Sequence, residues 1–281
     1  DAKNAGTLKW KDTLLFVTEG DSAASLTIAG VSSLKDKENY GVFPLKGKPL
    51  NVSDITKSKI ASNEEITKIM KILGLDSSKD SSSRLRYGGI VLMTDADVDG
   101  FHIRGLMIAM FKTLWPDLLK NGYVKCMITP VIKATKAKDD MSFFDVPSFN
   151  RWFEVNSGKG WTIKYYKGLG TSTSAEGREY FKLKEKYLKT YTVSGKDDEE
   201  AIEMSMGKGV GKADKRKDWL KTKMGESGGV DYQSLKDIPL RSFVDDELVL
   251  YTKESNERCI PSLVDGLKDS QRKILYTAIT S

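Results

Sequence analysis

Four acidic residues follow two predicted strands and could together hold a divalent metal ion. Glu19 ends one apolar run, and Asp95, Asp97 and Asp99 follow a second one. Because the carboxyl ends of parallel strands lie along one edge of a sheet, these side chains are expected to converge there. Carboxylates held together repel one another unless a cation lies between them. Mg²⁺ suits the set, since it takes oxygen ligands and contacts one or two carboxylates while it keeps several waters.

The acidic segment has two competing interpretations. The pattern D-x-D-x-D-G also opens an EF-hand calcium loop, but position 12 counted from Asp95 is Leu106 instead of the required Glu, so this interpretation is set aside. The other is a solvated acidic turn without a ligand; the apolar strand before it and the helix after it favour a functional site. Residues 19–23 alone are also compatible with an ordinary helix N-cap. The second acidic strand end strengthens their interpretation as part of a site.

Three apolar runs supply the strands that would position these acids. Residues 13–18, 88–94 and 123–132 are short, apolar and β-leaning. Between the last two runs, the apolar residues from Ile103 to Leu114 lie on one stripe of a predicted helix. The order strand, helix, strand predicts an α/β fold, with a parallel, Rossmann-like sheet flanked by helices and joined by right-handed crossovers.

The sequence pattern of the chain changes after residue 135 and again after residue 237. We therefore predict three parts. The first is an α/β domain over residues 1–135, and the second is a mostly helical extension and linker over 136–237. The third, over 238–281, is the start of a further helical unit.

The composition excludes several classes of protein. The 281 residues carry 45 Lys and Arg against 39 Asp and Glu, a net charge of +6 with a pI of about 9.0, which favours a polyanionic partner. The only two cysteines, Cys126 and Cys259, exclude a disulfide scaffold and favour a reducing compartment. The single histidine, His102, excludes a His-rich zinc site. There is no apolar run long enough to span a membrane, and the basic run 207–223 is predicted to be a solvated surface rather than a DNA track.

Two short segments, one after each of two predicted strands, resemble a known module. Residues 19–23 (EGDSA) and residues 95–100 (DADVDG), each after a predicted strand, resemble the Toprim module that topoisomerases, primases and some nucleases share. Five further segments are similar to the type IIA DNA topoisomerases, in particular to the eukaryotic-type, single-chain enzymes. These segments are residues 44–52 (PLKGKPLNV), 65–75 (EITKIMKILGL), 165–172 (YYKGLGTS), 216–220 (RKDWL) and 254–275 (ESNERCIPSLVDGLKDSQRKIL).

The resemblance implies how the chain fits into a larger enzyme. Members of this family combine an ATP-hydrolysing N-terminal gate, a Toprim domain and a winged-helix DNA gate that bears a tyrosine nucleophile. Residues 1–135 would be the Toprim domain, residues 136–237 its extension with the KGLGTS segment, and residues 238–281 the start of the winged-helix unit. The nucleophilic tyrosine and the ATP site are expected outside this chain.

By the same resemblance, the activity is ATP-driven passage of one DNA duplex through another, which relaxes supercoils and decatenates DNA. The tyrosine attacks a DNA phosphodiester, and the freed 3′-OH later reseals the strand. The expected partners are double-stranded DNA and a second copy of the protein, without a membrane. The expected location is the nucleus, with a viral factory, the cytoplasm or an organelle as the alternative for a viral or organellar source.

The resemblance also assigns roles to the acids. Glu19, Asp95 and Asp97 would hold Mg²⁺ near the scissile phosphate, with Mn²⁺ or Ca²⁺ as substitutes, and Glu19 could exchange a proton with the 3′-oxygen. Asp99 would support a second ion or orient Asp97. The sequence departs from the family's usual residues at Phe101, Cys259 and Asp269. None of these departures replaces a carboxylate of the predicted site.

Basic residues and glycines are the candidates for DNA contacts. The candidates are Lys46, Lys48, His102, Lys167, Gly168 and Gly170. The lysines would add charge that releases counterions from DNA, and the glycines would let the backbone approach a phosphate closely. For any single lysine a solvated loop charge is nearly as well supported, and for His102 a helix cap is equally well supported.

Two other functions stay open at this point. A Toprim nuclease would hydrolyse DNA instead of resealing it, although the residues after 238 resemble a tyrosine-bearing gate; a covalent protein–DNA adduct would distinguish the topoisomerase. A DNA- or protein-binding module with merely structural acids is the second. It predicts that Mg²⁺ leaves the melting temperature unchanged.

Overall fold

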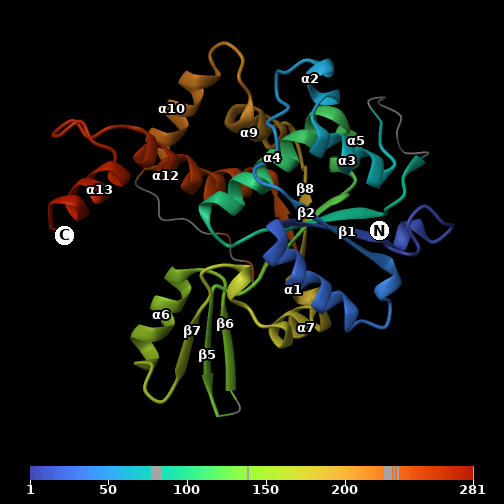
Figure 1. Cartoon of the computed structure of the whole chain (residues 1–281), viewed down its shortest axis with the longest axis horizontal. Coiled ribbons are helices and arrows are strands. Elements are labelled where there is room, and N and C mark those ends of the chain that lie inside the picture. The colour runs from blue at the N-terminus through green and yellow to red at the C-terminus, as the bar shows by residue number, and fades with distance from the viewer. Residues whose placement is uncertain (77–83, 138, 225–229, 231, 233, 281) are drawn as a thin grey trace.

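The computed structural model describes residues 1–76, 84–137, 139–224, 230, 232 and 234–280. A six-stranded sheet lies at its centre, with the strand order β2-β1-β3-β4-β8-β9 (Figure 1). Its strands are β1 (Leu14–Glu19), β2 (Tyr40–Leu45), β3 (Gly89–Met93), β4 (Val124–Met127), β8 (Leu188–Thr192) and β9 (Asp237–Pro239). The first four run parallel, β8 is antiparallel to β4, and β9 is parallel to β8. The predicted α/β fold is therefore confirmed, and the two later strands make the sheet mixed.

Helices cover both faces of this sheet (Figure 1). Apart from α6 (Val146–Asn156), the α-helices that precede β9 are α1 (Gly20–Ser32), α2 (Lys57–Ala61), α3 (Glu64–Leu73), α4 (Val98–Leu114), α5 (Pro116–Lys120), α7 (Ser174–Lys182), α8 (Lys184–Tyr187), α9 (Lys196–Met206) and α10 (Lys212–Lys223). Alternate residues of β1 divide between two cores. Leu15 and Val17 join the cluster that contains α3, α4 and α9, whereas Phe16 joins the cluster of α1 and α7. This two-sided burial explains why β1 and β3 are nearly continuous apolar runs.

Helix α4 is more deeply buried than its sequence pattern predicts. One apolar stripe was expected, but residues 103–111 are all buried. The physical reason is that α4 contacts a further layer of helices, formed by α9, the π-helical η5 (Phe243–Leu248) and α12 (Val249–Cys259). A helix covered on all sides is apolar all round, and the charged exception here is Arg104.

Residues 123–132 form parts of two strands, where the sequence predicted one. The first part is β4 of the main sheet, and the second begins β5 (Ile132–Lys136) of a separate sheet. Pro130 lies between the two strands, and proline lacks the backbone N–H that a continuous strand would need. The predicted boundary after residue 135 falls within β5, whose partner strands both follow it.

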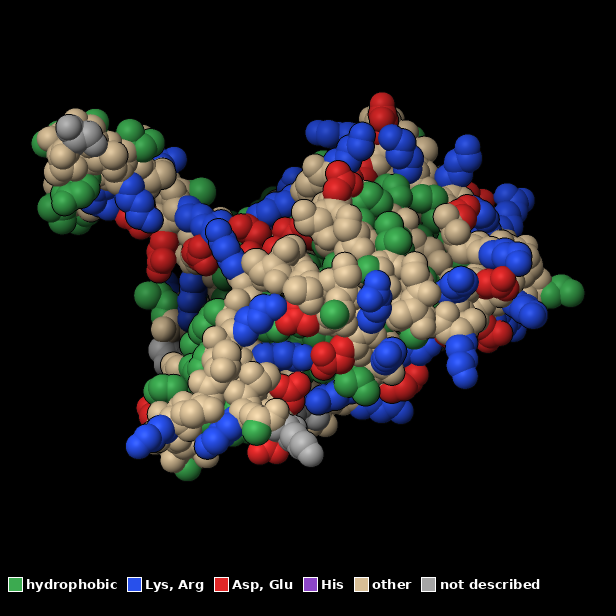
Figure 2. Space-filling model, turned by 60° about the horizontal axis from the view of Figure 1, so that its bottom comes forward, with side chains coloured by type: hydrophobic (Ala, Val, Ile, Leu, Met, Phe, Trp, Pro, Cys, Tyr) green, Lys and Arg blue, Asp and Glu red, His purple; other side chains and the backbone are tan. Residues whose placement is uncertain are grey.

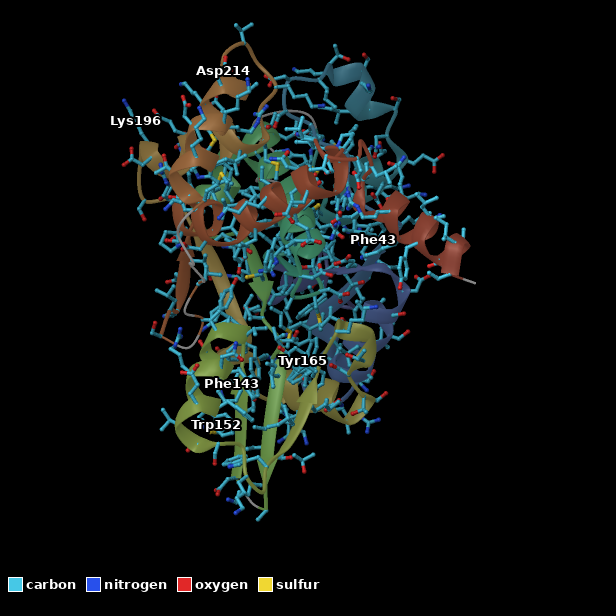
Figure 3. All side chains as sticks on the ribbon, turned by 90° about the vertical axis from the view of Figure 1, so that its left-hand side faces the viewer. Phe43, Phe143, Trp152, Tyr165, Lys196 and Asp214 are labelled. Atoms are coloured by element: carbon cyan, nitrogen blue, oxygen red, sulfur yellow. The ribbon has the colours of Figure 1, made fainter. Side chains whose placement is uncertain are left out.

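The smaller sheet has three antiparallel strands in the order β6-β5-β7. It is completed by β6 (Asp139–Phe143) and β7 (Thr162–Tyr165) and covered by α6 (Val146–Asn156). Aromatic side chains fill the space between this sheet and α6; the rings of Phe143 and Trp152 lie 5.2 Å apart (Figure 3). The extension therefore contains a small sheet in addition to its predicted helices.

The C-terminal residues pack partly on the main core. The remaining elements are α11 (Leu240–Ser242), α13 (Asp269–Thr280) and the short helices η1 (Trp10–Asp12), η2 (Lys37–Asn39) and η4 (Leu169–Thr171). Phe243, Val244 and Leu248 belong to the same buried cluster as α4. Helix α13 has no buried residue and projects from the body (Figure 1). The predicted boundary after residue 237 lies within β9, so the segment up to η5 is part of the packed unit.

Cys126 is buried and Cys259 is exposed, and both are free thiols. Among the described residues, no helix is both long enough and apolar enough to cross a membrane.

Candidate metal centre

Glu19 and Asp95 meet at the carboxyl edge of the main sheet. β1 and β3 are neighbouring parallel strands whose register pairs Thr18 with Met93, so the residues that follow them lie close together. The backbone N–H of Asp95 donates to Oε2 of Glu19 at 3.1 Å, across 76 residues of sequence. The structure therefore brings these two acids to one place.

Both carboxyl groups lie in surroundings that disfavour their charge. Burial raises the pKa of Glu19 to about 6, and Asp95, Asp97 and Asp99 add to the rise, against the hydrogen bond from the Asp95 backbone. Burial and the neighbouring Asp97 also raise the pKa of Asp95, although the N–H of Leu169 opposes them. A cation at this position would relieve both effects.

Asp97 lies beside this pair as the N-cap of α4. Its Oδ1 accepts a hydrogen bond from the backbone N–H of Gly100 at 2.8 Å. Glycine is needed at that position, because a Cβ on Gly100 would lie 2.1 Å from the carbonyl oxygen of Asp95. The D-x-D-x-D-G segment therefore folds as a compact helix cap. We call Glu19, Asp95 and Asp97 the acid edge.

The KGLG loop, which was predicted to approach DNA phosphates, approaches Asp95. The backbone N–H of Leu169 donates to Oδ1 of Asp95 at 2.7 Å. A Cβ on Gly168 would lie 2.3 Å from Oδ2 of the same carboxylate, so a side chain at this position would displace the carboxylate or the loop. Gly170 makes ordinary contacts, at 3.5 Å or more from its ideal Cβ. The sequence had indicated close backbone approach in this loop, but to a phosphate and not to an acid of the site.

Asp99 is engaged by two cations. Nζ of Lys48 lies 2.7 Å from its Oδ1, and Nη1 of Arg258 lies 3.1 Å from its Oδ2. The hydrogen bond from Lys48 is the main cause that lowers the pKa of Asp99, and Arg258 adds to it against the effect of burial. We call these three residues the ion-paired cluster. Asp99 thus lies in a different electrostatic environment from Asp95.

His102 packs against α12 and does not cap α4, since Asp97 does so. Its ring stacks on Tyr251, with centroids 3.8 Å apart and an interplanar angle of 15°. Nζ of Lys48 lies 4.6 Å from the centroid of the same tyrosine. Burial, with Lys48 nearby, lowers the pKa of His102 to about 4, so the ring is neutral at pH 7. Its Nδ1 is buried and has no hydrogen-bond partner among the described residues.

The other two lysines predicted to contact DNA are exposed. The side chain of Lys46 points to solvent, while its backbone N–H donates to Oε1 of Glu65 at 2.8 Å. Lys167, in the KGLG loop, is exposed as well. Their contacts with phosphate stay a prediction.

The donor set of the acid edge suits a hard divalent ion with few protein ligands. Within the described ranges, no group of three or more acidic, cysteine or histidine side chains is arranged to hold a metal ion. Glu19 and Asp95 offer carboxylate oxygens in a partly buried place, and Mg²⁺ commonly takes one or two carboxylates, with waters and phosphate completing its shell. This pair is the part of the predicted set that the conformation brings together, with Asp97 adjacent.

A buried ion pair behind the acid edge was missed by sequence reasoning. Nη1 of Arg104 lies 3.3 Å from Oε2 of Glu247, and each side chain is 4% exposed. Nε of Arg104 also donates to the hydroxyl of Thr94 at 3.1 Å. Thr94 directly precedes Asp95 in the chain. The sequence signal was an arginine inside an apolar helix, but its partner lies 143 residues away.

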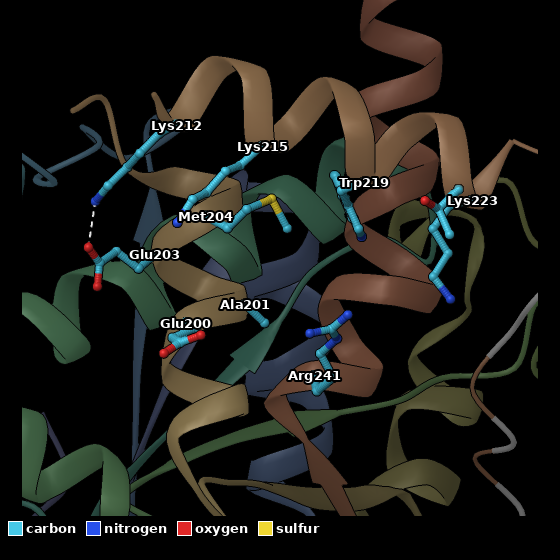
Figure 4. A pocket seen from close by; sticks show the side chains of 10 residues that line it. Glu200, Ala201, Glu203, Met204, Lys212, Lys215, Trp219, Lys223 and Arg241 are labelled. Atoms are coloured by element: carbon cyan, nitrogen blue, oxygen red, sulfur yellow. Dashed lines mark hydrogen bonds and ion pairs between the residues drawn. The ribbon is translucent and has the colours of Figure 1, made fainter. Parts of the chain in front are cut away.

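The basic run 207–223 forms a largely ion-paired surface, consistent with the solvated face predicted for it. Its helix, α10, lines a cleft of about 520 Å³ together with α9 (Figure 4). Lys212 pairs with Glu203 at 2.6 Å, and Lys217 pairs with Asp214 at 2.9 Å. Figure 2 likewise shows cationic and acidic side chains interspersed over one face of the molecule.

Comparisons with known proteins agree with this architecture. Residues 14–129 match the Toprim domain family, and residues 127–256 match the family described as the C-terminal associated domain of TOPRIM. The chain is 43% identical over 293 residues to DNA topoisomerase 2-beta of Gallus gallus, which covers 99% of this chain and 18% of that protein. It is 44% identical over 288 residues to the mitochondrial DNA topoisomerase 2 of Dictyostelium discoideum. That match covers 99% of this chain and 22% of that protein.

A solved structure is similar over the whole chain. The crystal structure of the Plasmodium falciparum topoisomerase II DNA-binding, cleavage and re-ligation domain superposes with a TM-score of 0.88 and 40% identity, covering 100% of this chain and 38% of that one. The sheet is therefore that of a Toprim domain, followed by its C-terminal associated domain. More specifically, the chain belongs to the eukaryotic-type DNA topoisomerase II family, and it spans less than a quarter of the length of the curated relatives named above.

Proposed function

We propose that this chain is the Mg²⁺-binding Toprim part of a type II DNA topoisomerase. The complete enzyme would cleave both strands of one duplex through a tyrosine outside residues 1–281, pass a second duplex through the break and reseal it, driven by ATP. Toprim domains of topoisomerase II are generally metal-binding, and the choice of Mg²⁺ rests on the donor chemistry. The main support is the hydrogen bond that joins Glu19 to Asp95 at the sheet edge.

The residues of the chain would hold the metal ion and exchange a proton with the 3′-oxygen. Glu19 and Asp95, with Asp97 beside them, would hold the ion, and the N–H of Leu169 keeps Asp95 in place. When bound, Mg²⁺ supplies charge neutralisation at the transferring phosphoryl group. Without a cation the pKa of Glu19 is about 6, so this carboxyl group can carry a proton part of the time near neutral pH. We assign to it the proton exchange with the 3′-oxygen.

We assign DNA contacts to the residues around the acid edge. These are Lys46, Lys48, His102, Lys167, Gly168 and Gly170. For Lys48, the bond to Asp99 would have to be exchanged for a phosphate. For the glycines, the contact would be made by the backbone. For His102, the neutral stacked ring would contribute packing or a hydrogen bond instead of charge.

The assembly and the location are proposed from the resemblance to the relatives. We infer that the complete protein acts on double-stranded DNA as a homodimer and that it works in the nucleus, as eukaryotic topoisomerase 2 homologues suggest. The relative from Dictyostelium discoideum is named as mitochondrial, which keeps an organelle as the alternative.

A cleavage assay with the complete enzyme tests the proposed function. With Mg²⁺ present, denaturing the reaction is expected to trap a covalent protein–DNA adduct, which a nuclease would not form. Glu19→Ala and Asp95→Ala should abolish the adduct, whereas Asp214→Ala, which alters an exposed acid of α10, should not. Adduct formation at the wild-type level in both site variants would refute the metal role.

A further inference from the structure

The loop between β7 and α7 is held at both ends by one carboxylate. From before the loop, Nζ of Lys164 donates to Glu176 at 2.7 Å and the hydroxyl of Tyr166 donates to it at 2.5 Å. From after the loop, the backbone N–H of Thr173 donates to Oε2 of Glu176 at 2.7 Å. A single side chain of α7 therefore closes the base of the loop 167–172.

Glu176 is charged and its helix is fixed in place. Burial opposes its ionisation, but the hydrogen bonds from the three donors outweigh burial and lower the pKa of Glu176 to about 2. Helix α7 packs tightly on α1, since a Cβ on Gly177 would lie 2.7 Å from the side chain of Leu26. The carboxylate is therefore a stationary acceptor at neutral pH.

The opposite side of the same loop contacts Asp95. Leu169 donates its N–H to that carboxylate at 2.7 Å, and a Cβ on Gly168 would lie 2.3 Å from its Oδ2. The Leu169 side chain is 2% exposed and packs in the cluster of Phe16 and Met93. The backbone of the loop, anchored by the buried Leu169, thus forms a short link from Glu176 to Asp95.

We propose that Glu176 is a positioning residue for the metal site. By closing the base of the loop, it holds the Leu169 N–H and the Gly168 backbone against Asp95 and so fixes the orientation of that carboxylate. The inference rests on the proposed function, because the orientation of Asp95 matters only if Asp95 binds the ion. Helix capping alone does not account for the arrangement: a capping box serves the first donors of its helix, whereas this carboxylate also accepts from Lys164 and Tyr166.

Four substitutions in the complete enzyme separate this role from a loss of stability. Glu176→Ala removes the acceptor, and Gly168→Ala displaces the loop from Asp95 while Glu176 stays intact. Glu179→Ala is the matched control, because it breaks a 2.9 Å ion pair between the same helix and the buried Lys133. Glu176→Gln keeps an acceptor oxygen and serves as the conservative variant.

Two readouts are needed, one of which does not involve the metal. The first is hydrogen exchange of residues 165–172, measured by mass spectrometry without Mg²⁺ or DNA. The second is the Mg²⁺ concentration that gives half-maximal DNA cleavage. We expect Glu176→Ala and Gly168→Ala to speed exchange and to raise that concentration roughly tenfold, as for lost supporting contacts in metal sites. Glu176→Gln should be intermediate, and Glu179→Ala should match the wild type in both.

Distinct results would overturn the inference and the proposed function. An unchanged Mg²⁺ requirement in Glu176→Ala, or an equal shift in Glu179→Ala, would overturn the positioning role, whatever the exchange rates. Wild-type cleavage that survives Asp95→Asn would instead overturn the proposed function, and the inference with it.

Discussion

The acid edge and the ion-paired cluster are built from one acidic segment but differ in their electrostatics. Asp95 lies under the KGLG loop, where burial and Asp97 raise its pKa. Asp99, four positions further on, faces Lys48 and Arg258, which lower its pKa. The comparison shows that the spacing of the three aspartates does not by itself give them a common role. Distant parts of the chain contribute their neighbours, and these neighbours give Asp95 and Asp99 different electrostatic environments.

The difference predicts which region attracts a cation. At the acid edge, Glu19 and Asp95 lie together and none of the hydrogen bonds described for them comes from a basic side chain. In the ion-paired cluster the negative charge is already balanced. We therefore expect metal binding to depend on the first region and to tolerate changes in the second.

The largest expected effect separates the two aspartates in the complete enzyme. Asp95→Asn should lower Mg²⁺-dependent cleavage by more than about 10³-fold, because several kcal/mol of charge stabilisation depend on the bound ion. Asp99→Asn should cost less than about tenfold, because it removes a supporting contact only. Single-turnover cleavage rates at saturating DNA measure both, and equal losses would break the comparison.

A second prediction concerns the buried ion pair of Arg104 and Glu247. Arg104→Met leaves Glu247 buried and unpaired, so the free energy of unfolding should fall by about 3–5 kcal/mol. The double variant Arg104→Met with Glu247→Leu should recover most of that loss. Urea denaturation gives both values, and a double variant as unstable as the single one would show that the pair itself is not the cause.

The sequence could predict the strands and the convergence of their acids because those depend on local patterns. The apolar runs of β1 and β3, and the parallel order that follows from the helices between them, bring Glu19 to Asp95. The contacts of Leu169, Arg258 and Arg104 could not be predicted, because each joins residues more than 70 positions apart that no periodicity relates. Pro130 is visible in the sequence, but residues 123–132 were still predicted to form a single strand.

Opposite pH dependences should distinguish the regions when metal is removed by a chelator. The pKa of Glu19 rises from 4.5 to about 6 on folding, so its burial costs stability as the pH increases through that window. The pKa of Asp99 lies below 3.8, so its ion pairs add stability above that value and lose it as the pH falls through the folded pKa.

Substitutions test these slopes. Glu19→Gln should remove the loss of stability between pH 4.5 and about 6, and Asp99→Asn should remove a loss at low pH. The urea midpoint measured across this pH range gives the result. The sign assigned to Glu19 is wrong if its substitution steepens the loss of stability with rising pH.

The smallest expected effect concerns two lysines near the site. Lys46→Ala should flatten the logarithmic dependence of DNA affinity on salt by about one unit, because its exposed charge is free to meet a phosphate. Lys48→Ala should change the slope less, since Lys48 is engaged by Asp99 at 2.7 Å. Binding titrations at several salt concentrations measure this, and an unchanged slope for Lys46→Ala would remove it from the DNA contacts.

The central claim is that Glu19 and Asp95 act together on one ion. Calorimetric titration of Mg²⁺ into the complete protein, with Glu19→Gln, Asp95→Asn and the double variant, tests it most directly. We predict that each single substitution abolishes the binding seen at this site and that the double variant is no weaker than either single one. Wild-type affinity in Asp95→Asn, or losses that simply add, would contradict the account.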